Sequence, residues 1–160
     1  MIVMDSQAKI FRNKQGDIEL IPYDYKSNGY RKVLNNAYKD NLMQIIFTTS
    51  IYKRIIEKAY QKGLFVTRIN FMDLLDDHDF TDIKDLVTQV NASNGNKTLI
   101  NILIKEIDWF ANNESIDIKS IELFDRENNQ KIEIYNNGVI LGEIDQFEVV
   151  KTNILSVLMV

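Results

Sequence analysis

The sequence contains no cysteine, one histidine and one proline among its 160 residues. Without cysteine the chain has no disulfide, no thiolate metal ligand and no thiol nucleophile. One histidine cannot build a three-histidine metal centre, and the sequence has no Gly-rich phosphate loop, Walker motif, dinucleotide fingerprint or nucleophile elbow. These absences favour a non-catalytic protein, so we expect no enzymatic activity, no cofactor and no metal.

Long apolar runs are also missing. The longest run is far below the roughly 18 residues that a membrane-spanning helix requires. The first five residues show no basic region followed by an apolar one, which a secretory signal would need. We therefore expect a cytoplasmic protein. With no repeat and no linker-like tract, residues 1–160 are expected to form a single domain.

The composition carries two further indications. Ile, Asn, Lys and Tyr, whose codons are rich in A and T, are abundant, which indicates a low-GC bacterium or one of its phages or mobile elements. The net charge of −4 argues against a general nucleic-acid coat, because binding to phosphates draws on a surplus of Lys and Arg.

Hydrophobic patterning predicts an N-terminal hairpin followed by helices. Gly16 and the residues around it form the hairpin turn, and a helix that starts at residue 48 or 49 ends before Gly63. Residues 42–47 fit either a backward extension of that helix or a short buried strand. The predicted elements of this half are strands over 8–12, 18–23 and 64–71 and helices over 30–38 and 48–62.

In the second half, Thr81 is predicted to cap a helix that continues to about residue 90, and a second helix covers residues 99–112. Strands are predicted over 116–123, 131–135 and 139–141, with a hairpin turn at Gly138. Residues 144–160 fit a strand or a helix equally well. The predicted fold class is α+β: an N-terminal β-hairpin, central helices and a C-terminal antiparallel β-meander.

An acidic run is the first candidate site. It comprises Asp73, Asp76, Asp77, Asp79, Asp82 and Asp85, with His78 among them. Oxygen ligands at this density suit Mg²⁺ or Mn²⁺, but the spacing differs from that of a calcium EF-hand. Such carboxylates could equally be solvated, or could imitate a row of phosphates and occupy the basic surface of a partner.

A basic, tyrosine-rich segment is the second candidate. Arg31, Lys32, Lys53, Arg54 and Lys58 could contact phosphates, with aromatic rings to stack on bases. Tyrosine and arginine also dominate protein–protein hot spots. We expect Tyr52 and Tyr60 to belong to the core stripe of their helix, whereas Tyr23, Tyr25 and Tyr30 are candidates for the surface.

A third feature is Asp117-Ile118-Lys119, a short match to the D-x-K element of one class of metal-dependent nucleases. That class needs an upstream carboxylate on a neighbouring strand. Here the preceding acids, Glu106 and Asp108, are predicted to lie on a helix, so the context does not fit. Trp109 is predicted to anchor the edge of the core.

The segregated charge leads to a functional prediction. Small acidic domains of this composition are similar in general character to phage anti-CRISPR inhibitors and to immunity proteins that neutralise toxic nucleases. We expect a non-catalytic inhibitor that binds a nucleic-acid-processing enzyme with a basic surface. The residues expected to contact this partner are Asp76, Asp77, Asp79, Asp82, Tyr23, Tyr25 and Tyr30.

Two alternatives remain open. The first is a nucleic-acid-binding accessory or regulatory protein that uses the basic segment. The second is a metal-dependent nuclease or hydrolase built on the aspartates. The oligomeric state cannot be predicted from the sequence.

Overall fold

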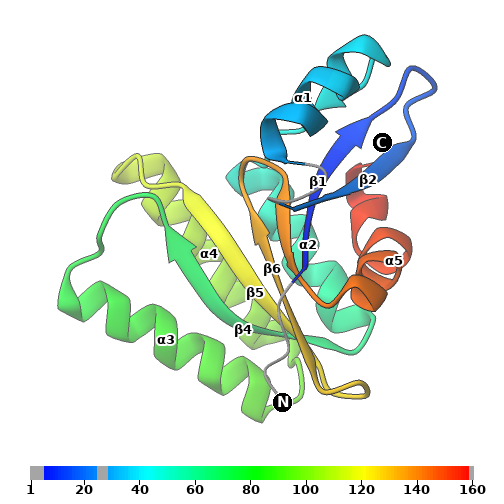
Figure 1. Ribbon diagram of the computed structural model, residues 1–160. Helices are drawn as coiled ribbons and strands as arrows, with labels where there is room; N and C mark the ends of the chain where they lie inside the picture. Colours follow the sequence, from blue (N-terminus) through cyan, green and yellow to red (C-terminus); the bar gives the residue numbers. More distant parts are fainter. Residues whose placement is uncertain (1–5, 25–28, 159–160) are drawn as a thin grey trace.

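In the computed structural model, which describes residues 6–24 and 29–158, seven strands form one antiparallel sheet (Figure 1). The strand order is β2-β1-β7-β6-β5-β4, and the short β3 pairs with the end of β1. The strands are β1 (Ser6–Arg12), β2 (Ile18–Tyr23), β3 (Met43–Gln44), β4 (Leu64–Phe71), β5 (Ile118–Asp125), β6 (Gln130–Tyr135) and β7 (Val139–Gly142). Pairing of β1 with β7 joins the N-terminal hairpin to the C-terminal strands, so the two form one sheet.

Five α-helices and one 3-10 helix accompany this sheet in the described ranges. They are α1 (Tyr30–Lys39), α2 (Thr49–Gln61), α3 (Asp77–Ala92), α4 (Lys97–Asn113), α5 (Ile144–Asn153) and η1 (Leu155–Leu158). None of them combines the length and apolarity that crossing a membrane requires. The α+β class, the N-terminal hairpin, the central helices and the C-terminal antiparallel strands are confirmed.

Strand β1 is buried on both faces. Ala8 and Ile10 belong to the main core, while Phe11 joins a second, smaller core with Val33 and Ala37 of α1. Because successive side chains of a strand point to opposite faces, α1 covers one face of the hairpin and the main core lies against the other. The hairpin turns at Gly16, whose φ of +86° favours glycine.

Helix α2 lies in the middle of the main core, and its buried residues follow the apolar periodicity of its sequence. Its fully buried side chains include Tyr52, Ile55, Ile56 and Ala59, which follow one another at helical spacing. The helix begins after Thr48, whose side chain accepts a hydrogen bond from the backbone N–H of Ile51 at 3.2 Å. This boundary and the end before Gly63 are as predicted.

Three ambiguous or incorrect boundaries have physical explanations. Helix α3 begins four residues before the predicted cap Thr81, because Asp76 is the N-cap and its carboxylate accepts the backbone N–H of Asp79 at 2.8 Å. The segment 42–47 contains only a two-residue strand. The C-terminal segment is helical rather than extended, and Phe147 and Val150 of α5 enter the main core together with Leu155 of η1.

The helices are divided unevenly between the faces of the sheet. Helices α2, α3, α4 and α5 all contribute to the main core, α3 from the edge where it packs against β4 and α4, whereas α1 contributes to the smaller core. Figure 1 shows α3 along the β4 side and α1 at the opposite end, above the hairpin. The first turn of α3 and helix α1 therefore lie far apart on the molecule.

Candidate protein-binding surface

The β4–α3 loop and the first turn of α3 bring acidic and apolar side chains together at the surface. We call this region the α3 cap surface and define it by Met72, Asp73, Leu74, Asp76, Asp77 and Phe80. All six residues are exposed. Leu74 is 99% exposed, and Met72 and Phe80 are 54% and 57% exposed. Large apolar side chains this exposed, surrounded by carboxylates, are what a partner would cover.

The backbone of this surface is fixed at both ends. The backbone N–H of Met72 donates to the carbonyl of Asp117 at 2.8 Å, which attaches the loop to the strand side of the fold. The amide of Asn136 lies 3.1 Å from the sulfur of Met72, next to the β6–β7 turn. At the other end, the Asp76 cap orders the first turn of α3. Anchors on both sides hold the exposed side chains in a defined arrangement, which lowers the entropic cost of binding.

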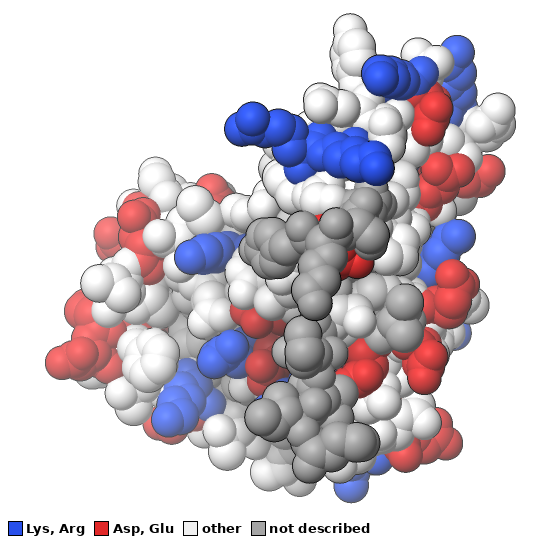
Figure 2. Space-filling view, viewed as in Figure 1, with Lys and Arg blue, Asp and Glu red and all other residues white. Residues whose placement is uncertain are grey.

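Charge is distributed unevenly over the surface. Figure 2 shows Asp and Glu side chains over the β4–α3 loop and the start of α3 and also along the opposite side of the molecule, whereas Lys and Arg side chains gather over α1. Two of the four predicted aspartates, Asp76 and Asp77, lie on the α3 cap surface. Asp79 is half-buried and Asp82 is exposed one turn further along α3.

His78, Asp79 and Asp82 form a small group on one side of α3. The Nδ1 atom of His78 lies 3.2 Å from a carboxylate oxygen of Asp82 and 3.9 Å from one of Asp79. Their ligand atoms are close enough to share an ion. All three come from one exposed helical turn, however, and an i,i+4 His–Asp pair on a helix is an ordinary stabilising contact.

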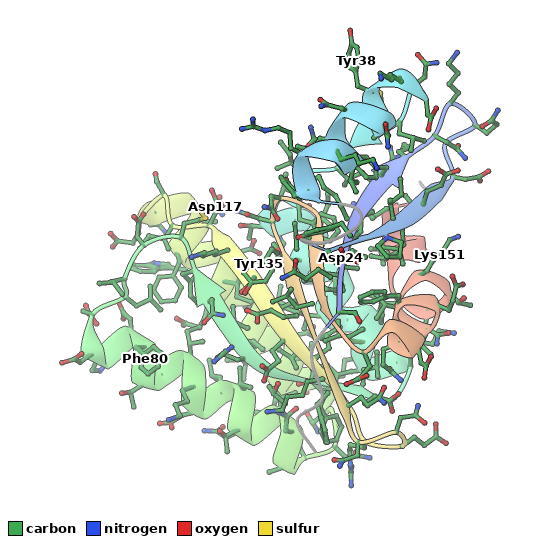
Figure 3. All side chains as sticks on the ribbon, in the orientation of Figure 1. Asp24, Tyr38, Phe80, Asp117, Tyr135 and Lys151 are labelled. Carbon is green, nitrogen blue, oxygen red and sulfur yellow. The ribbon has the colours of Figure 1, made fainter. Side chains whose placement is uncertain are left out.

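The predicted tyrosines are placed differently from the aspartates. Tyr23 and Tyr30 are both half-buried and pack edge to face against each other, with ring centroids 5.3 Å apart. Tyr25 lies outside the described residues. Among the tyrosines of the described ranges, Tyr38 is the exposed one, at 85%, and it points away from the molecule at the far end of α1 (Figure 3). Apolar anchors for a partner are therefore provided by the α3 cap surface rather than by Tyr23 and Tyr30.

The basic residues are divided between two helices. Arg31 and Lys32 are exposed on α1, which packs on the hairpin, whereas the others lie on α2 against β4, β5 and α4. On α2, Arg54 is exposed, Lys58 is half-buried, and the Lys53 ammonium pairs with Asp108 at 2.6 Å. Because the Asp108 carboxylate balances the charge of Lys53, the surface of α2 carries less net positive charge than its sequence suggests.

The short D-x-K match has a structural explanation. Asp117 is exposed immediately before β5, where its carboxylate accepts the hydroxyl of Thr49 at 2.7 Å. Glu106 and Asp108 lie on α4, as expected. Trp109, predicted at the edge of the core, is 47% exposed and stacks edge to face on Phe110 with ring centroids 5.5 Å apart.

A polar cluster on the face of β4, β5 and β6 opposite the main core was not predicted from the sequence. Glu122 and Glu133 lie directly opposite each other on β5 and β6, and the Arg68 guanidinium lies 3.6 and 3.8 Å from them. The buried hydroxyl of Ser120 donates to Glu133 at 2.9 Å. Opposed carboxylates repel unless cations lie near them, so Arg68 and the Lys131 ammonium, 3.8 Å from Glu122, stabilise this pairing.

Tyr135 extends the same cluster, and its position in the sheet is labelled in Figure 3. Burial raises the pKa of the Tyr135 hydroxyl, and the neighbouring Glu133 carboxylate raises it further. A neutral tyrosine next to a carboxylate is a hydrogen-bond donor, so the cluster satisfies its own polar groups.

Lys9 is the most deeply buried cation among the described residues. It is fully buried, its ammonium donates to the carbonyl of Asn137, and it lies 5.6 Å from the ring centroid of Tyr30. Burial lowers the pKa of Lys9. These contacts connect β1 to the β6–β7 turn, so Lys9 has a structural role.

Comparison with protein-family models, with curated protein sequences and with solved structures gave no match.

Proposed function

We propose that this protein is a non-catalytic inhibitor that binds a nucleic-acid-processing enzyme through the α3 cap surface. The observation that supports this most directly is the combination of Leu74, 99% exposed, with Met72, Phe80 and the surrounding aspartates. A central apolar anchor with a charged rim is how protein interfaces concentrate their binding energy.

The charge of the rim supports the nature of the partner. Asp73, Asp76 and Asp77 place negative charge around the apolar side chains, and a complementary surface would be basic. Enzymes that process nucleic acids carry such basic surfaces, because they bind phosphates. An acidic ligand that occupies the surface would compete with the nucleic acid and inhibit without any chemistry of its own.

The first test is affinity capture from a nuclease-treated lysate of a low-GC bacterium, followed by assay of the captured enzyme. The wild-type chain should retain a protein whose cleavage or processing of nucleic acid falls when the chain is added. The double variant Asp73→Lys/Asp77→Lys, at two exposed residues of the α3 cap surface, should lose this partner. The matched control Glu127→Lys/Glu148→Lys makes the same change in net charge at exposed sites in the β5–β6 turn and on α5 and should retain it. Equal loss in both variants would show that only net charge matters, and would contradict a specific surface.

A second pair of variants tests the apolar anchor. Leu74→Ala should weaken binding of the captured partner at least tenfold, which is the size of a hot-spot residue. Tyr38→Ala removes another highly exposed side chain, on α1, and should leave binding unchanged. If Tyr38→Ala rather than Leu74→Ala weakens binding, the partner contacts α1 and the proposed surface is wrong.

Helix α1 supports a second candidate function, the binding of nucleic acid. Between Tyr30 and Lys39 it carries Arg31, Lys32 and Lys39 and no acidic residue, with Tyr38 exposed at its end. Exposed cations next to an aromatic ring suit single-stranded nucleic acid. Retention on labelled single-stranded DNA or RNA that falls steeply with salt, and is lost in Arg31→Ala/Lys32→Ala, would favour this function over the first.

A further inference from the structure

An apolar groove lies between the edge strand β4 and helix α3. It has a volume of about 260 Å³, and its apolar walls are Ile69, Phe71, Leu75, Phe80, Ile83 and Val87. Two cations, Arg68 and Lys84, line the same groove. We propose that this groove binds one medium-chain alkyl carboxylate, with the chain between β4 and α3 and the carboxylate at the cations.

The size of the groove limits the length of the ligand. Its volume is slightly below the roughly 300–1,000 Å³ of pockets that hold drug-sized molecules. A methylene group is similar in size to a water molecule, whose share of liquid volume is about 30 Å³. The groove therefore accommodates on the order of eight such groups, which corresponds to an acid such as octanoate.

The charge of the groove determines the head group. Lys84 is exposed on α3, and none of the ion pairs found in the described part of the chain includes its ammonium. The Arg68 side chain is 57% exposed and lies 3.6 and 3.8 Å from Glu122 and Glu133, longer than a good charged hydrogen bond. Lys84 can therefore form an ion pair with an incoming carboxylate, and Arg68 adds positive charge at the groove although it also faces Glu122 and Glu133. An alcohol of the same length carries no charge for this pair, and an amine is repelled by the cations.

This site differs from the α3 cap surface, although Phe80 contributes to both. The cap surface depends on Leu74 and the aspartates, none of which lines the groove. The inference therefore does not rest on the inhibitor proposal, and each can fail without the other.

Methyl NMR of the full chain, titrated with sodium octanoate, tests the groove directly. The methyl signals of Ile69, Ile83 and Val87 should shift in a saturable manner. Hexanoate, which is two methylenes shorter, should bind roughly fifteenfold more weakly, because each buried methylene contributes about a fourfold gain in affinity. 1-Octanol and octylamine should bind more weakly than octanoate. Equal binding of the alcohol would overturn the assignment of a carboxylate, and the absence of shifts at these methyl groups would overturn the site.

Substitutions then locate the two ends of the ligand. Lys84→Gln should weaken octanoate binding about threefold, in the range of an exposed ion pair, while Lys105→Gln on α4 should leave it unchanged. Thr88→Trp places a large ring at the groove and should abolish binding, whereas Thr81→Trp, an exposed α3 residue outside the lining, should not. Unchanged binding in Thr88→Trp, with the fold confirmed by circular dichroism, would overturn the proposal. None of these variants alters Leu74, so loss of octanoate binding with retention of the protein partner separates the two proposals.

Discussion

Helix α2 and the start of α3 use similar residues for opposite purposes. Both begin with a polar side chain that caps the helix, and both contain large apolar residues close to that cap. In α2 those residues are buried, and the Tyr52 hydroxyl donates to the carbonyl of Ile134 at 3.0 Å. At the start of α3 they are exposed. The fold accounts for the large apolar side chains of α2, whereas folding alone gives no reason for Leu74 to be apolar.

The largest expected effect is on the free energy of unfolding, and it tests whether the buried residues of α2 and the exposed residues of α3 differ in structural role. Ile56→Ala removes a fully buried side chain of α2 and should lower the free energy of unfolding by about 2–5 kcal/mol. Phe80→Ala, on α3, should lower it by about 1 kcal/mol or less, because the ring is 57% exposed. Urea denaturation of both variants measures the difference. Similar losses would mean that Phe80 is a structural residue and not a surface anchor.

A pH experiment sharpens the contrast between buried and exposed polar groups. Burial raises the pKa of Tyr60 in α2 to about 12, against about 10 in the unfolded chain. Between these values the unfolded state has released this proton and the folded state has not, so stability present below pH 10 should fall as the pH rises towards 12. The contribution of Tyr60 is about 3 kcal/mol at most. Denaturation at pH 9.5 and 11.5 should show a smaller decrease for Tyr60→Phe than for the wild type. An identical decrease would show that Tyr60 is not the group responsible.

Smaller effects are expected from the two caps. Thr48→Ala in α2 and Asp76→Ala in α3 each remove one cap and should cost about 1 kcal/mol. The Thr48 variant should lower global stability, whereas the Asp76 variant should mainly increase amide hydrogen exchange at Asp79, because the first turn of α3 is held by fewer tertiary contacts. Thr48→Ser and Asp76→Asn retain a side-chain acceptor and serve as controls. Global unfolding in the Asp76 variant would mean that this turn is part of the cooperative core.

The smallest expected effect on stability is that of Leu74→Ala. The side chain is 99% exposed, so the free energy of unfolding should change by no more than about 0.5 kcal/mol. Thermal denaturation, followed by circular dichroism, measures the change. A clear destabilisation would indicate that Leu74 packs within the protein, and its proposed role as an anchor would lose its basis.

Local chemistry explains why most elements could be predicted. The strands around Gly16 and Gly138 were predicted because glycine accepts the positive φ that their turns require. The start of α3 could not be predicted in the same way. Its apolar periodicity begins only at Ile83, and Phe80 faces outward, so the pattern placed the cap at Thr81 instead of Asp76.

The candidate site was predicted only in part. The acidic side chains at the start of α3 were predicted because aspartates are clustered in that part of the sequence. The basic side chains of α1 were predicted in the same way, from a local excess of Lys and Arg. The exposure of Met72, Leu74 and Phe80 was not visible, since a single apolar residue in a sequence resembles a core residue. The pairing of Glu122 with Glu133 depends on strand register, which no local pattern determines.

Pairing of β1 with β7 also determines at what point during synthesis of the chain the sheet can be completed. Ala8 is opposite Ile140, so the centre of the sheet joins segments that are synthesised far apart in time. Until β7 has left the ribosome, only the two-residue β3 pairs with that side of β1, and the rest of this strand edge stays open. Contacts so distant in sequence make folding slow, and an edge left unpaired is prone to association with other chains. Fragments that end before residue 139 should therefore aggregate rather than fold.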